Sequence, residues 1–402
     1  MAKISKFGEA FLLLALRIGK HINGYVDFYI GPAKFENLVN NESISSPNEL
    51  LNNCMILQKS LFVQGYDKDR ERYLESHLLA MQTSIEDLLE VEIPFKEKFL
   101  RIFDVDLQPI KESKLENLMN DFNEAYKGMG SLEERMKILR ERRKVPEDKI
   151  YSLFEEALNI TRKKTKEIFG NILPKDERII LELINDNNDK QAKWAYYEWY
   201  LGNFQSQIEI NPKYDLYWTT FLSAAAHEGY PGHHTNFAIN EEYLFKELNQ
   251  SEHSILLLKS PKLVICEGIA DIALDMLFSY REQAELSLQF SVNVIKEDTV
   301  ENLARQNRVK AEQSLFWYNL AYHALFDKWS EEKLFKYAAS FKFLGEKNLK
   351  NTIKLIFDPV YSTNFFSYNL GRKLIINKYG EYPSTKNFQN LLSNPVIPSD
   401  LV

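Results

Sequence analysis

Near its middle the chain reads His227-Glu228-Gly229-Tyr230-Pro231-Gly232-His233-His234, directly after a largely apolar run over residues 221–226. Three of its seven histidines thus surround one glutamate. Neutral imidazole is a common ligand of zinc, and a carboxylate beside a metal ion can take the proton of an activated water. The stretch therefore predicts a metal site with its own general base, as in a metallohydrolase.

The spacing of these histidines does not suit a regular helix. In the common HExxH signature the two histidines stand four apart and share one helical face. Here His233 follows His227 by six positions, about 240° around an ideal helix, and His234 stands roughly 10 Å along the axis from His227. The ring of Pro231 clashes with the carbonyl four residues back, and Gly232 tolerates unusual dihedral angles. We therefore expect a kink or two looped-out residues, which would make His233 the second ligand and leave His234 for contacts to ligands or substrate.

A third ligand is expected downstream, because catalytic zinc usually keeps three side chains and one open position. The segment Leu263–Asp275 has the pattern of a predominantly apolar helix with embedded carboxylates. Glu267 is the best candidate, since an unpaired carboxylate would be costly there and Gly268 lets another backbone approach. Asp271 lies one turn further on the same face and could orient a histidine ligand. The alternatives are a polar surface turn for the histidine cluster and a buried ion pair for Glu267.

With these residues the chain resembles the zincin-like family catalogued as domain of unknown function 885, whose hallmark is HExxPGHH followed by an EG-W-A segment. The second segment here reads Glu267-Gly268-Ile269-Ala270, with isoleucine in place of the family's tryptophan. Three further stretches look like family elements, so the resemblance covers mainly the second half of the chain. They are Gly202-Asn203-Phe204, Ile210-Asn211-Pro212 and Ser367-Tyr368-Asn369-Leu370-Gly371.

The resemblance implies the mostly helical fold of the gluzincin peptidases, related to the carboxypeptidase Taq and oligopeptidase families. It also implies zinc as the metal ion. Carried over to this sequence, it gives His227, His233 and Glu267 as ligands and Glu228 as the general base.

One element departs from the family pattern. The family's DTGLH segment before a Trp-Ser pair is replaced by Asn319-Leu320-Ala321-Tyr322-His323 before Trp329-Ser330, which keeps the histidine and lacks the aspartate. A lone histidine on an apolar helix is more often a satisfied core residue. A place in the core and a role beside the substrate therefore both stay open for His323.

A tetrahedral intermediate also needs a hydrogen-bond donor for its oxyanion. Tyr368 is our first choice, and the charge of nearby Arg372 suits a substrate carboxylate; the alternative is a core tyrosine. In the expected mechanism zinc lowers the pKa of its water, Glu228 accepts the proton and returns it to the leaving amine, and Tyr368 donates to the oxyanion. The expected substrate is a peptide or small amide. A hydrolase of other amides or esters and a zinc-binding protein without catalysis are the alternatives.

Composition limits the classes of protein to which the chain can belong. A chain of 402 residues that is 45% hydrophobic can bury a sizeable core. The net charge of −7 argues against nucleic acid as a partner. Only Cys54 and Cys266 occur, so we expect no disulfide framework and a cytoplasmic location. The apolar run Phe11–Leu16 is too short for a membrane span, and its charged flanks do not fit a secretory signal. Nothing in the sequence indicates an oligomeric state.

The predicted fold class is mainly α, with a small β element beside the metal-binding helix. Apolar side chains recur at helical spacing over residues 73–89 and 115–126. Ile208-Glu209-Ile210 alternates like a short edge strand, which could pair with an extended peptide. The aromatic run Trp194–Tyr200 either lines a substrate groove or packs in the core. A boundary in the polar stretch Asn185–Asp189 would divide residues 1–185 from 186–402, although the two regions could form one continuous domain.

Overall fold

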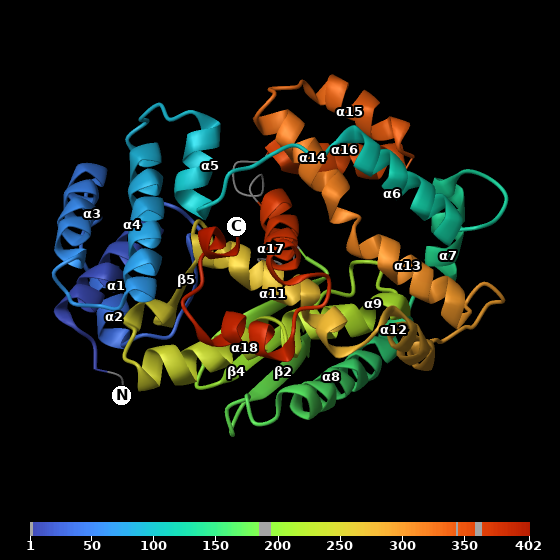
Figure 1. Ribbon diagram of the computed structural model, residues 1–402, viewed down its shortest axis with the longest axis horizontal. Coiled ribbons are helices and arrows are strands. Elements are labelled where there is room, and N and C mark those ends of the chain that lie inside the picture. The colour runs from blue at the N-terminus through green and yellow to red at the C-terminus, as the bar shows by residue number, and fades with distance from the viewer. Residues whose placement is uncertain (1–2, 185–193, 343–344, 358–363) are drawn as a thin grey trace.

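Helices dominate the computed structural model, which describes residues 3–184, 194–342, 345–357 and 364–402 (Figure 1). The helices predicted over 73–89 and 115–126 are both present, as α4 and α6. The α-helices are α1 (Lys6–Gly19), α2 (Ala33–Asn41), α3 (Pro47–Leu61), α4 (Lys68–Leu88), α5 (Phe95–Phe103), α6 (Glu112–Ala125), α7 (Leu132–Arg143), α8 (Glu147–Phe169), α9 (Trp218–Ala224), α10 (His233–Ile239), α11 (Pro261–Leu277), α12 (Tyr280–Ser287), α13 (Val300–Ala311), α14 (Ser314–Leu325), α15 (Glu331–Ser340), α16 (Glu346–Phe357), α17 (Asn364–Tyr379) and α18 (Thr385–Ser393).

Short helical turns and two small sheets complete the described part of the chain. The fold is thus mainly α with a small β element, as predicted. Among the described residues no helix has the length and apolar character that a membrane span needs. The turns are η2 (Ala225–Gly229), η3 (Asn240–Glu247), η4 (Ser251–Ser254), η5 (Leu288–Phe290) and η6 (Pro398–Leu401), and the strands are β1 (Val26–Tyr29), β2 (Arg178–Leu183), β3 (Tyr196–Gly202), β4 (Gln205–Ile210) and β5 (Ile255–Leu257).

The first four helices pack around a core of their own, at the left of Figure 1. Leu12, Leu50 and Met81 are fully buried there. Strand β1 pairs antiparallel with β5, which directly precedes α11 and adds Ile255 and Leu257 to the same core. The N-terminal helices are therefore tied to the second half of the chain by β5.

The largest core takes side chains from Phe99 to Leu401, on both sides of residue 185. The predicted boundary at Asn185–Asp189 lies outside the described residues, so the division into 1–185 and 186–402 stays a prediction. Helix α11 runs through the middle of this core, with α17 packed against it (Figure 1). The helix that carries Glu267 is therefore held in the interior of the protein.

The three-stranded sheet lies beside the histidine segment 227–234, in the strand order β2-β4-β3. Strand β4 is parallel to β2 and antiparallel to β3, so the main-chain groups of Ile208-Glu209-Ile210 face strands on both sides. The prediction of an edge strand was therefore wrong, and β4 has no open edge for a peptide. Strand pairing depends on partners distant in sequence, which the alternation of β4 does not reveal. Its buried side chains lie against the histidine segment, with Ser206 2.7 Å from Nδ1 of His234 in α10 and Ile208 beside Gly229 of η2.

Candidate metal centre

The histidine segment is a broken helix. Helix α9 passes into the π-helical turn η2, the chain leaves helical geometry at Tyr230, and α10 begins at His233. The amide of Gly232 donates to the carbonyl of Ala226 at 3.0 Å, six residues back instead of the four of an α-helix. Two extra residues are thus accommodated between His227 and His233, as the sequence predicts.

Glycine is required on the inner side of this break. A Cβ atom at Gly232 would overlap the carbonyl oxygens of Ala226 and His227. A Cβ atom at Gly229 would lie 2.7 Å from Leu158 in α8. The peptide bond between Tyr230 and Pro231 is cis. No larger residue at position 232 would leave this path of the chain unchanged.

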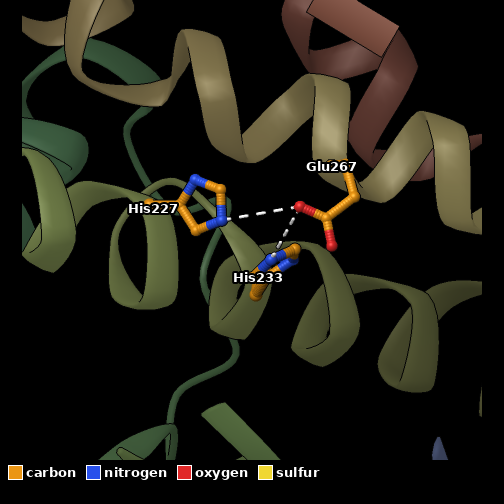
Figure 2. A group of neighbouring side chains, drawn as sticks. All are labelled: His227, His233 and Glu267. Carbon is orange, nitrogen blue, oxygen red and sulfur yellow. Dashed lines mark ion pairs between the residues drawn. The ribbon is translucent and has the colours of Figure 1, made fainter. Parts of the chain in front are cut away.

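The break brings His227 and His233 together with Glu267 of α11 (Figure 2). Nε2 of His227 lies 3.6 Å from Oε2 of Glu267, and Nε2 of His233 lies 3.8 Å from the same oxygen. One ligand atom from each residue lies within 4.8 Å of the other two. Zinc bonds of 2.0–2.2 Å in a tetrahedron place ligand atoms about 3.3–3.6 Å apart. A small inward movement of the three side chains would therefore suit a single cation.

Two polar atoms of this cluster, one on Glu267 and one on His233, lack hydrogen-bond partners within the described part of the chain. Oε2 of Glu267 and Nδ1 of His233 are buried without a hydrogen-bond partner. Burying such atoms unpaired is costly. The side chains of His233 and Glu267 each keep 12% of their surface exposed, and that of His227 keeps 22%. Two imidazoles and a carboxylate with unpaired atoms fit a bound cation. Their partial exposure would let that cation also contact solvent or substrate.

Charges around the cluster favour a bound cation. Burial lowers the pKa of His227, but the carboxylates of Asp271 and Glu267 outweigh it and raise this pKa well above its usual value. Burial and the charge of His227 lower the pKa of His233. The site therefore attracts positive charge, and its two imidazoles do not readily hold a proton each.

Asp271 occupies the position predicted for it. Its Oδ1 lies 3.4 Å from Nδ1 of His227, so it can fix the ring with Nε2 turned toward Glu267. Arg372 of α17 donates to the carbonyl oxygen of Asp271 at 3.1 Å and forms an ion pair with Asp275 at 2.9 Å. Arg372 is thus a buried support of α11, while a contact with a substrate carboxylate stays a prediction.

Glu228 follows His227 directly in η2 and is half-buried. Burial and the nearby charge of Glu267 raise the pKa of its carboxyl to about 7, against the opposing effect of His227. It is not one of the three clustered residues that could hold a metal ion. A carboxyl next to such a cluster but outside it is available for proton transfer.

His234 points away from the cluster into a buried hydrogen-bond network. Its Nδ1 lies 2.7 Å from Oγ of Ser206 in β4, and its Nε2 lies 3.2 Å from Oε2 of Glu177. The same Glu177 oxygen accepts from the hydroxyl of Tyr230 at 2.5 Å, while Arg162 donates to the other oxygen. Two roles were predicted for His234, contact with a substrate or support of the histidine segment. His234 is fully buried, so only the second role fits.

Two other predicted residues, Tyr368 and His323, have different outcomes. Tyr368 lies in α17, but its side chain is outside the described part of the chain, so its role stays a prediction. His323 in α14 contacts Asp327 at 2.6 Å and stacks on Trp329 with ring centroids 4.0 Å apart. These contacts support the core alternative for His323.

Two further carboxyls near the centre were missed by the sequence analysis. Glu198, on the inner face of β3, is buried, and burial raises its pKa well above the usual value. Asp27 of β1 accepts from the hydroxyl of Tyr197 at 2.6 Å, and burial raises its pKa to about 6. Neither lies in a recognisable motif.

The aromatic run Trp194–Tyr200 was expected either to line a groove or to pack in the core. Its Tyr200 packs with Phe28 and Phe237, as the core alternative predicted.

No protein-family model matches the chain, and no curated protein matches it in sequence. Its fold is similar to the crystal structure of "the putative lipoprotein from Colwellia psychrerythraea", with a TM-score of 0.57 and 15% sequence identity. That match covers 92% of this chain and 68% of the other. At this identity the likeness concerns the fold alone.

Proposed function

We propose that the protein is a zinc-dependent hydrolase, and a peptidase of the zincin type. The observation that carries the proposal is the convergence of His227, His233 and Glu267, with Glu228 beside them and outside the ligand set. Ligation alone does not require a fourth group, here a second carboxyl, next to a ligand histidine. The extra carboxyl favours catalysis over a purely structural metal site.

In this proposal each side chain has one task. The zinc ion, when bound, acts as a Lewis acid on water and on a substrate carbonyl. Glu228 takes the proton from the attacking water and later gives it to the leaving amine. Asp271 keeps the ring of His227 in its ligating orientation. Tyr368 is proposed as the donor to the oxyanion.

Peptides are the proposed substrates because of the likeness to the family of domain of unknown function 885, which rests on the HExxPGHH and Glu267-Gly268 motifs. Membership of that family is part of the proposal. A cytoplasmic location is also proposed, since Cys54 and Cys266 are both buried and free. Cleavage of a peptide library, compared with simple esters and amides, distinguishes a peptidase from other hydrolases.

The decisive experiment replaces Glu228 with Gln. The variant keeps the three ligands, so zinc bound per chain, measured by mass spectrometry, is expected to match that of the parent. Peptide cleavage is expected to fall by about 10²–10⁴-fold, because the group that accepts the proton is lost. The control is Glu242→Gln, which makes the same change at an exposed position of η3 and should leave cleavage unchanged.

Two results would contradict the proposal. A Glu228→Gln variant as active as the parent shows that Glu228 is not the base. A parent protein that binds no zinc after incubation with the ion, or that keeps full activity in a chelator, rules out a metal-dependent reaction.

A further inference from the structure

A hollow lies between α6, α12, α13 and α17, away from the metal centre, with a volume of about 640 Å³. That is within the usual range for sites that bind small molecules. The buried guanidinium of Arg372 contributes to its lining, together with Tyr280 of α12 and the apolar side chains of Leu118 and Val309. This cavity combines apolar surface with charged groups from several elements.

Four charged side chains on its two main helices form no ion pair within the described part of the chain. Helix α6 contributes Asp121 and Glu124, and α13 contributes Arg305 and Arg308. Within residues 3–184, 194–342, 345–357 and 364–402, none of these four side chains forms an ion pair or a side-chain hydrogen bond. The two helices pack against each other, yet these acidic and basic groups lie beyond ion-pair distance. The space between them is part of the cavity.

Two other lining residues, from α6 and from the end of α13, do form an ion pair with each other. Lys114 of α6 lies 3.3 Å from Glu312, just beyond the end of α13. Opposite charges near a protein surface attract when they can approach. The hollow thus keeps one pair of cations and one pair of anions apart while both border the same space.

We propose that this cavity binds a small zwitterionic ligand, namely an amino acid or short peptide with free amino and carboxyl ends. The carboxylate would bind Arg305 and Arg308, because the guanidinium fork matches carboxylate geometry. The ammonium group would bind Asp121 and Glu124. A ligand with only one kind of charge would leave the other pair without a partner.

The floor of the cavity is linked to the metal centre. Arg372 lines the cavity and donates to the carbonyl oxygen of Asp271, whose carboxylate lies 3.4 Å from His227. A ligand in the cavity would therefore lie next to the support of a ligand histidine. The binding itself does not depend on the proposed function.

The test is calorimetric binding of trialanine to the full-length protein. Binding is expected to the parent and to weaken about tenfold or more when either end is blocked, as in N-acetyl-trialanine or trialanine amide. The double variant Arg305→Gln, Arg308→Gln should show a similar loss, with its melting temperature and zinc content unchanged. Arg281→Gln is the matched control, because Arg281 is an exposed arginine of α12 that pairs with Glu285 and does not line the cavity.

A His227→Ala variant separates this site from the metal centre. Trialanine binding is expected to persist there, because the cavity contains none of the proposed zinc ligands. Loss of binding in His227→Ala, equal binding by the double arginine variant and the parent, or no binding up to about 10 mM each overturns the proposal. None of these outcomes depends on peptide cleavage, so they leave the hydrolase proposal untouched.

Discussion

The broken helix places two adjacent histidines in different surroundings, one at the proposed metal site and one in the protein interior. His233 is the first residue of α10, and its Nε2 is turned toward Glu267. The next residue, His234, turns into the interior and links β4 to Glu177. On a helix neighbouring side chains point about 100° apart, so one of the two can ligate while the other anchors the segment.

Alanine at each position should separate these two roles. His233→Ala is expected to lose zinc, because two ligands hold a cation poorly. His234→Ala should keep zinc but lose about 1–3 kcal/mol of unfolding free energy, since Glu177 and Ser206 each lose a buried partner. Zinc content and urea unfolding measure the two effects. If His234→Ala loses the metal at unchanged stability, the ligands are wrongly assigned.

Asp271 acts on the metal through His227 in the proposed site. Asp271→Asn removes the negative charge that favours a fixed orientation of the His227 ring and nearly preserves the shape of the side chain. We expect zinc affinity to fall about 10–100-fold. Competition with a chromophoric chelator measures the change. An unchanged affinity would mean that the 3.4 Å contact between Asp271 and His227 does not support ligation.

At the scale of elements, the crossing of α11 and α17 positions Glu267. A Cβ atom at Gly268 would lie 2.5 Å from the carbonyl carbon of Gly371, and one at Gly371 would overlap the carbonyl oxygen of Val264. The two helices thus touch backbone to backbone, one residue from Glu267. This confirms the expectation that Gly268 allows close approach of another backbone.

The crossing makes Gly268→Ala an informative change. In an isolated helix the substitution stabilises by about 1 kcal/mol, because alanine has the higher helix propensity. Here the added methyl group must push α17 away, so we expect a loss of about 1–3 kcal/mol and weaker zinc binding. Thermal unfolding and zinc titration measure both. A variant more stable than the parent would show that α11 and α17 separate at little cost.

At the scale of the whole molecule, buried polar groups join the N-terminal helices to the second half of the chain. The ring of Tyr73 in α4 lies 4.0 Å from that of His77 and 4.7 Å from that of His253 in η4. Arg70 of α4 also forms an ion pair with Glu252 at 2.5 Å. Burial lowers the pKa of His77 to about 3 and that of His253 well below its usual value. Both imidazoles are therefore neutral in the folded protein at neutral pH.

This predicts a loss of stability in acid. The unfolded chain binds protons at its histidines below about pH 6.5, while the folded chain keeps His77 neutral down to about pH 3. The free energy of unfolding should thus fall as pH drops through this window, by at most about 1.4 kcal/mol per pH unit for each such histidine. His77→Gln should flatten this slope in urea unfolding between about pH 7 and pH 5. Equal slopes for the variant and the parent would contradict the assignment.

The sequence by itself determined what depends on neighbouring residues. Pro231 and Gly232 cannot continue a regular helix, so local geometry alone predicted a break there. That break accommodates the two extra residues between His227 and His233. The helical spacing in α4 and α6 and the place of Asp271 one turn after Glu267 followed in the same way. These predictions hold because bond geometry and helical periodicity act over a few residues.

Only the tertiary structure decided what depends on distant parts of the chain. Ile208-Glu209-Ile210 lies in the central strand because β2 and β3 pair on both sides of it, and no residue within β4 specifies those partners. Asp27 and Glu198 reach the centre from separate strands, and His234 finds Glu177 far back in the sequence. Packing brings such groups together through contacts with large sequence separation. Local patterns carry no record of those contacts.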